Sequence, residues 1–84
     1  MEIKTKFDVG DKVIGIAYNE IEEFWHIEYW FVIDSILCSY ENGKLEIIYD
    51  GKKLILRGID EQNCFATIEE AQAECDRRNN ETKI

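Results

Sequence analysis

The sequence contains no proline, only one histidine, and no apolar run long enough to cross a bilayer. Without proline, tight turns must be made by glycine, asparagine and aspartate. The apolar run Tyr29–Ile33 is far shorter than the ~20 residues of a membrane-spanning helix. The first residues, Met1 to Asp8, include no apolar segment of the kind that signal peptides carry. These absences predict a soluble cytoplasmic protein with no membrane partner.

Basic residues are also scarce: the chain has 10 lysines and arginines against 18 aspartates and glutamates, which gives a net charge of -8. Proteins that bind phosphate backbones usually carry a clustered basic face, so direct binding of nucleic acid is not expected. Hydrophobic residues make up 45% and aromatic residues 12% of the chain, enough for a folded core. Its 84 residues leave room for one domain, which we expect over 1–84.

Patterns typical of catalytic and metal sites are missing as well. The single histidine makes no Cys–His pair at a diagnostic spacing, and neither G-x-G-x-x-G nor G-K-[ST] occurs. A zinc ion could in principle be held by Cys38, Cys64, Cys75 and His26, but structural zinc sites usually use closely spaced ligand pairs. Free cysteines are more often small buried apolar residues. We therefore expect no enzyme, no cofactor and no metal.

Glycine and alternating apolar residues mark the first strands. In Phe7-Asp8-Val9-Gly10-Asp11-Lys12-Val13, Gly10 can adopt the positive φ of a type II turn, followed by a strand over Lys12–Tyr18. The β-favouring segment Phe24–Tyr40 is too long for one ordinary strand. We expect two strands, or one bent strand, with the break near Glu28–Trp30. Over Tyr29–Ile33 both strand faces are apolar, which fits a bend, a bulge or a stretch buried on two sides. Alternation puts five side chains on one face: Trp25, Ile27, Tyr29, Phe31 and Ile33.

Two turn signals follow. Asn42-Gly43 predicts a tight hairpin, and Asp50-Gly51 predicts another whose second strand returns through Lys52–Arg57. Ile59–Asn63 is expected to form a short helical turn before a last small strand at Cys64-Phe65. Together these segments predict five or six short antiparallel strands.

One helix is expected, over 68–79. Thr67-Ile68-Glu69-Glu70 is a capping box, in which the Thr67 hydroxyl accepts a hydrogen bond from the amide of Glu70. Ile68, Ala71 and Cys75 form a narrow apolar stripe, and because two of the three are small, the helix must either dock closely on the sheet or barely dock at all. The expected buried residues are Val13 or Ile14, Ile27, Ile33, Ile36, Leu45 or Ile47, Leu54 or Ile55, Phe65 and Ile68.

These elements predict a mainly β fold, a small antiparallel barrel over about residues 7–66 followed by the helix. The opening with Phe7, Gly10, Asp11 and Val13 resembles the first turn of SH3-like barrels. Together with the segment Cys64–Asn79, it is also similar to small uncharacterised proteins of phages and mobile elements of gut bacteria. The resemblance implies an SH3-like fold and a bacterial host cell, and it implies no catalytic residue.

Two groups of residues are candidates for contacts with a partner. The aromatic residues Trp25, Tyr29 and Trp30 either fill the core or form a contact anchor, and we expect at least one of the two tryptophans to lie partly at the surface. Carboxylates cluster at the first loop (Glu20, Glu22 and Glu23) and on the expected exposed face of the helix (Glu69, Glu70 and Glu74). They serve either for solubility or as an imitation of nucleic-acid phosphates.

These features favour a small acidic, non-enzymatic protein-interaction module. In its sharpest form the hypothesis is a phage or mobile-element protein that inhibits a host nucleic-acid-handling enzyme, of the anti-CRISPR or anti-restriction type. One alternative is a nucleic-acid-binding SH3-like or OB-like barrel that uses aromatic stacking. The other is a homodimeric regulatory subunit that uses the open edge of the barrel.

Overall fold

The computed structural model describes residues 4–52 and 58–81. Its elements are β1 (Lys12–Asn19), β2 (Phe24–Val32), β3 (Ser35–Glu41), β4 (Lys44–Asp50), β5 (Ile59–Asp60), a short 3-10 helix η1 (Glu61–Asn63), β6 (Cys64–Phe65) and α1 (Ile68–Glu81). The mainly β class, the number of strands and the C-terminal helix are confirmed. The predicted strand through Lys52–Arg57 falls largely on 53–57, outside the described residues. The tight hairpin predicted at Asp50-Gly51 is wrong, because Tyr49 pairs with Ile59 and a longer connection therefore joins β4 to β5.

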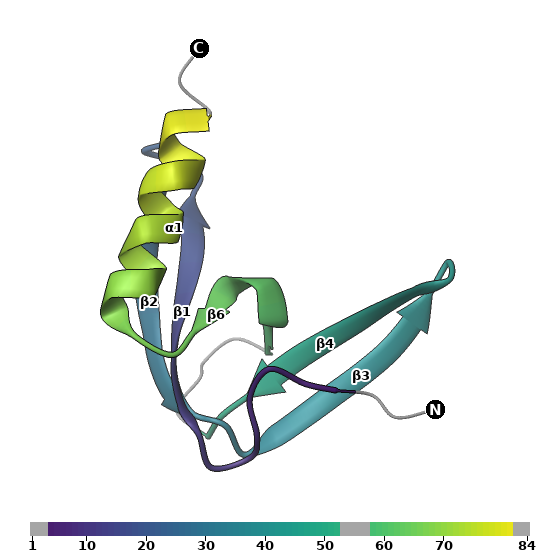
Figure 1. Cartoon of the computed structure of the whole chain (residues 1–84). Coiled ribbons are helices and arrows are strands. Elements are labelled where there is room, and N and C mark those ends of the chain that lie inside the picture. The colour runs from purple at the N-terminus through teal and green to yellow at the C-terminus, as the bar shows by residue number, and fades with distance from the viewer. Residues whose placement is uncertain (1–3, 53–57, 82–84) are drawn as a thin grey trace.

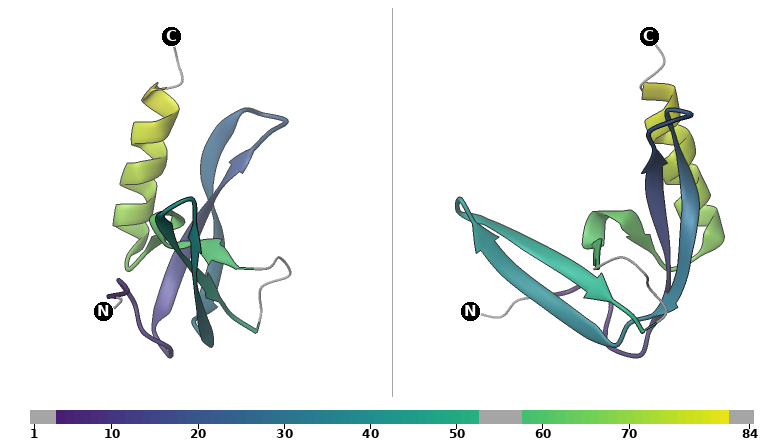
Figure 2. Two further views of the ribbon diagram at one scale, coloured as in Figure 1. Left: turned by 90° about the vertical axis from the view of Figure 1, so that its right-hand side faces the viewer. Right: turned by 180° about the vertical axis from the view of Figure 1, so that it is seen from behind.

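The six strands form two antiparallel sheets, in the orders β2-β1-β6 and β3-β4-β5. Figures 1 and 2 show the β1–β2 hairpin and the β3–β4 hairpin diverging from a common base, with α1 lying along the first hairpin. Within the described residues, the backbone pairing makes two open sheets, so the expected barrel is not closed.

The first turn holds the base of the two hairpins together. Gly10 has a φ of 98°, and the Asp11 amide donates to the Asp8 carbonyl at 3.0 Å, as a type II turn requires. The Gly10 amide donates to the carbonyl of Ile33 at 2.7 Å, and the Ile33 amide donates to the carbonyl of Asp11 at 2.9 Å. The chain therefore bends between sheets at Ile33-Asp34, and the break predicted near Glu28–Trp30 is wrong.

A β-bulge occupies the position where the break was expected. Gly15 lies opposite Tyr29 and Ile16 lies opposite Ile27, so Glu28 is an extra residue in β2. The extra residue reverses the alternation of side chains, so Tyr29, on one side of it, packs in the cluster between the sheets. Ile27, on the other side, packs in the cluster beneath α1. Of the bend, the bulge and the two-sided burial that the sequence allows here, the structure has the bulge.

The core consists of two clusters on opposite faces of β1. One lies between the sheets and contains Val13, Phe31, Ile33, Tyr49, Ile59 and Cys64. The other lies under the helix and contains Ile14, Ile16, Ala71 and Cys75. Of the predicted core residues, Val13, Ile14 and Ile33 are buried, while Ile27, Ile36, Leu45, Ile47 and Phe65 are half-buried. Leu54 and Ile55 lie outside the described residues.

The helix begins where the capping box predicts, since the Glu70 amide donates to the Thr67 hydroxyl at 3.2 Å. Ala71 and Cys75 are fully buried, which confirms close docking through small side chains. Ile68, by contrast, is 44% exposed, and its predicted burial is wrong. It opens the first turn of α1, ahead of the Ala71–Cys75 contact that seats the helix on the sheet.

Polar contacts fasten the other end of α1. The Asn79 side chain accepts a hydrogen bond from the Trp25 amide at 2.7 Å and donates one to the Trp25 carbonyl at 3.1 Å. Both backbone groups of one strand residue point to the same side, so Asn79 covers part of the outer edge of β2. The Arg78 guanidinium lies 4.5 Å from the centre of the Trp25 ring and donates to Asn63 Oδ1 at 2.8 Å. These contacts bind α1 to β2 and to η1.

Candidate functional site

The loop between β1 and β2 is the most exposed of the candidate sites. We call Glu20, Ile21, Glu22 and Glu23 the acidic tip. The side chain of Asn19 accepts hydrogen bonds from the amides of Ile21 at 2.9 Å and Glu22 at 3.0 Å, which fixes the turn. Ile21 is 93% exposed, and no ion pair among the described residues involves the three carboxylates. The acidic tip thus presents an apolar side chain between three uncompensated negative charges.

The carboxylates of the helix do not join the acidic tip. Glu69 and Glu70 are exposed in the first turn of α1, whereas the acidic tip lies toward its C-terminal end (Figure 1). A helix of 14 residues is about 21 Å long, so the two acidic groups are separated by more than a Debye length. The acidic tip and the carboxylates of the first helical turn therefore act as two separate acidic surfaces.

Glu74 differs from the other acidic candidates. Its carboxylate is 2.5 Å from Arg77 and 2.6 Å from Arg78, and its side chain is only 19% exposed. Hydrogen bonds from Arg77 and Arg78 lower the pKa of Glu74 to about 2. Glu74 thus lies beside the exposed face of the helix rather than on it, and its charge is already compensated within the fold.

The two tryptophans have different environments. Trp25 is half-buried, in edge-to-face contact with Tyr18 at 5.5 Å and under the Arg78 guanidinium, so it serves mainly to hold α1. Trp30 is 51% exposed, which confirms that one tryptophan lies partly at the surface. Tyr29 is half-buried against the inter-sheet cluster, and burial raises its pKa. Of the three aromatic candidates, Trp30 is therefore the one available to a partner.

Trp30 lies beside an open hollow of about 620 Å³ that is lined by Lys12, Trp30, Phe31, Val32, Asp34 and Lys52. We call this the Trp30 patch. The Lys12 ammonium is 5.1 Å from the centre of the Trp30 ring, a cation–π contact, and Val32 is 53% exposed. Sequence reasoning did not identify Lys12 and Val32. The register of β1 against β2 would have identified both residues, since Lys12 pairs with Val32 and Val32 shares a strand face with Trp30.

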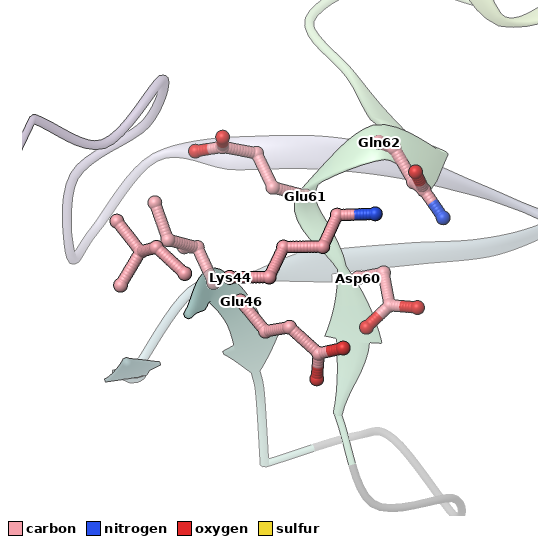
Figure 3. A pocket seen from close by; sticks show the side chains of 7 residues that line it. Lys44, Glu46, Asp60, Glu61 and Gln62 are labelled. Carbon is pink, nitrogen blue, oxygen red and sulfur yellow. The ribbon is translucent and has the colours of Figure 1, made fainter. Parts of the chain in front are cut away.

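A second hollow lies between β4 and η1, where Lys44 extends among Glu46, Asp60, Glu61 and Gln62 (Figure 3). Glu61 accepts hydrogen bonds from the Tyr49 hydroxyl at 2.5 Å and the Lys6 amide at 2.8 Å. Burial, together with this carboxylate, raises the pKa of Tyr49 to about 12. Glu61 therefore anchors the N-terminal segment to the second sheet, so its contacts are structural.

The residues considered as zinc ligands do not converge. Cys38 is exposed on β3, while Cys64 and Cys75 are buried in different core clusters. Burial raises the pKa of Cys64 to about 12, which disfavours the thiolate that a metal requires. His26 is half-buried on β2, with its Nε2 against the carboxylate of Glu28. Across residues 4–52 and 58–81, no three His, Cys, Asp or Glu side chains are grouped to hold a metal.

No family model, curated protein or solved structure matches this chain. In the described part of the chain, no helix has the length and apolar character needed to cross a membrane. The exposed chemistry of the acidic tip and the Trp30 patch is therefore the basis for a functional proposal.

Proposed function

We propose that this protein is a non-enzymatic interaction module whose acidic tip binds a partner protein. The observation that carries the proposal is the 93% exposure of Ile21 between three carboxylates on a hydrogen-bonded turn. The matching surface on the partner is an apolar depression with basic residues at its rim. Long-range attraction between the charges speeds the encounter, and burial of Ile21 slows dissociation.

The turn also limits the entropic cost of binding. Asn19 already holds the amides of Ile21 and Glu22, so little backbone freedom is lost when a partner closes over the loop. Burying an isoleucine side chain contributes about 1.5–3 kcal/mol. A side chain that fills a well-packed pocket, with contacts around it that exclude water, is the usual setting of an energetically dominant interface residue.

In its sharper form, the proposal is that the partner is a host nucleic-acid-handling enzyme, such as a restriction or CRISPR nuclease in a bacterial cytoplasm. The protein would be a phage or mobile-element product whose carboxylates take the place of phosphates in the basic groove of the enzyme. The net charge of -8 supports this form, because such a groove attracts any dense array of negative charge.

The sharper form is tested by cleavage assays with a panel of purified restriction and CRISPR nucleases. The wild-type chain should inhibit at least one nuclease, and inhibition should weaken as salt rises. Changing Glu20, Glu22 and Glu23 to Gln should slow association, and Ile21→Ser should speed dissociation. Glu69→Gln with Glu70→Gln is the control, since these changes remove two negative charges at the opposite end of α1.

Equal inhibition by all variants would refute a role for the acidic tip. Losses in proportion to the charges removed, three in the tip variant and two in the helix variant, would show that only total charge matters. If no nuclease is inhibited, the sharper form is wrong. Affinity capture with wild-type and Ile21→Ser chains then tests whether the acidic tip binds any partner protein. That proposal is wrong if both chains retain the same proteins.

A second candidate function rests on the Trp30 patch. Trp30 is 51% exposed with Lys12 against its ring, and Lys52 lines the same hollow together with one carboxylate, Asp34, so this surface is aromatic with a small excess of positive charge. Single-stranded nucleic acid binds such surfaces by base stacking and phosphate contacts. Titration with mixed oligonucleotides should quench tryptophan fluorescence in the wild type and not in Trp30→Leu. Absence of quenching at low salt would exclude this function.

A further inference from the structure

The outer edge strands of the two sheets, β2 and β3, differ in how well they are protected from pairing with another chain. The outer edge of β2 is covered at Trp25 by the Asn79 side chain and distorted by the bulge at Glu28. Both devices prevent an exposed strand from pairing with another chain. The outer edge of β3 has neither, and no strand of the described residues pairs with it.

β3 is well suited to edge pairing. Its seven residues pair with β4 without a register shift, from Ser35 opposite Asp50 to Glu41 opposite Lys44. Between Ser35 and Tyr40 it carries no charge and no proline, which are the usual means of protecting an edge. Leu37 is 62% exposed, and Cys38 is exposed beside it. A regular, uncharged, exposed edge is a template for an added strand.

The hairpin turn indicates which backbone groups are available. Asn42 and Gly43 have φ values of 55° and 76°, as a two-residue type I′ turn requires. In such a turn the flanking pair, Glu41 and Lys44, exchanges hydrogen bonds, and outward-pointing residues then alternate along the strand. Cys38 and Ile36 consequently direct their amide and carbonyl groups away from β4.

We propose that β3 pairs antiparallel with β3 of a second copy of this chain, so that two three-stranded sheets become one six-stranded sheet. Charge restricts where a second copy can bind. Copies with a net charge of -8 repel one another, and the repulsion is weakest where the contact is uncharged. Ser35–Tyr40 is uncharged and lies on an edge with which no described strand pairs, and Glu41 at the end of β3 is the one charge of this strand. A symmetric interface uses the same patch on both subunits, which this strand provides.

The shape of the molecule also supports a second copy of this chain as the partner of β3. The β3–β4 hairpin projects away from α1 and from the acidic tip (Figure 2). Antiparallel pairing of two such hairpins places the helices and acidic tips at opposite ends of the dimer. Repulsion between the copies is then screened by salt, and both acidic tips stay exposed. The dimer therefore does not depend on the proposed function of the acidic tip and does not compete with it.

Full overlap of the two strands places Cys38 opposite Cys38 of the second copy, on the two-fold axis. Hydrogen-bonded pairs of antiparallel strands have Cα atoms ~5.5 Å apart, within the range that a disulfide spans. Diamide, an added thiol oxidant, would take two electrons and two protons from the two thiols as the S–S bond forms. Cys38 is the exposed cysteine, while Cys64 and Cys75 are buried, so the product should be a single covalent dimer.

Sedimentation velocity over a concentration series under reducing conditions tests the proposal. The wild type and Cys38→Ser should both form dimers. Cys38→Asp should dimerise about tenfold more weakly, because two carboxylates would face each other across the axis. Cys38→Lys should do the same. An equimolar mixture of Cys38→Asp and Cys38→Lys should recover the dimer, which also shows that both variants fold.

Three results would overturn the proposal. The first is a wild type that stays monomeric at the highest attainable concentration. The second is a dimer that forms equally well with Cys38→Ser and Cys38→Asp, since the interface would then lie elsewhere. The third is failure of the Asp and Lys variants to pair when mixed. None of these results bears on the acidic tip, whose own variants leave β3 unchanged.

Discussion

The contact between Asn79 and β2 predicts a large effect from a very small change, Asn79→Asp. The amide of Asn79 accepts from the Trp25 amide at 2.7 Å and donates to the Trp25 carbonyl at 3.1 Å. A carboxylate has the same shape but keeps only the first of these bonds. Its second oxygen would face the carbonyl oxygen of Trp25, two acceptors with no proton between them.

The expected loss of stability in Asn79→Asp has two parts. Losing a hydrogen bond costs about 0.5–1.5 kcal/mol, and leaving a partly buried carbonyl without a donor costs about 1–3 kcal/mol. We expect a total of roughly 2–3 kcal/mol in the free energy of unfolding. For a domain of this size, total stability is roughly 4–13 kcal/mol, and each kcal/mol shifts Tm by ~4–8 °C. Asn79→Asp should therefore lower Tm by about 10–20 °C.

Asn80→Asp is the matched control. Asn80 is the next residue of α1, is exposed, and would receive the same charge in the last turn of the helix. A negative charge there costs about 0.3–1 kcal/mol through the helix dipole, and this cost is common to both variants. Thermal unfolding followed by circular dichroism measures the difference between them. Equal Tm values for the two variants would refute the reasoning.

Three further predictions concern stability. Gly58→Ala should lower the free energy of unfolding in urea by about 2–3 kcal/mol, because the φ of Gly58 is 69° and the new Cβ would lie 2.2 Å from a methyl group of Ile48. Gly43→Ala is the control: its φ is similar and nothing lies within 4 Å, so it should cost only ~1–2 kcal/mol. Stability should be fully present below pH 9 and fall between pH 9 and 12, because the fold raises the pKa of Cys64 from 9.0 to about 12 and of Tyr49 from 10.0 to about 12; Cys64→Ala should remove the part of this loss that begins at pH 9. Stability should also fall as the pH drops from 4.5 toward 2, since the pKa of Glu74 is lowered to about 2, and a flat acid profile in Glu74→Gln would confirm the assignment.

Much of the fold could be predicted from the sequence because its signals are local. The turn at Gly10, the hairpin at Asn42-Gly43 and the helix start at Thr67 each depend on a few neighbouring residues with special backbone or capping preferences. Alternation of apolar residues then identifies β1 and β2 as strands. These signals do not require knowledge of what the elements pack against.

The candidate site was predictable only in part. The acidic tip was identified as a run of carboxylates, but the role of Ile21 depends on its exposure, and alternation by itself does not reveal which side of a loop faces solvent. Glu74 differs from Glu69 and Glu70 because Arg77 and Arg78, three and four residues further along α1, pair with its carboxylate. That spacing is visible in the sequence, so this difference was open to prediction.

Composition and local pattern by themselves determined the acidity, the β-rich class, the turns at Gly10 and Asn42-Gly43, and the helix. The tertiary structure alone decided the bulge at Glu28, the exposure of Trp30 and the contrast between the covered edge of β2 and the open edge of β3. The physical reason is that each of these depends on a partner far along the chain. Glu28 is extra only relative to β1, and β2 is covered only because Asn79, 54 residues away, reaches its edge.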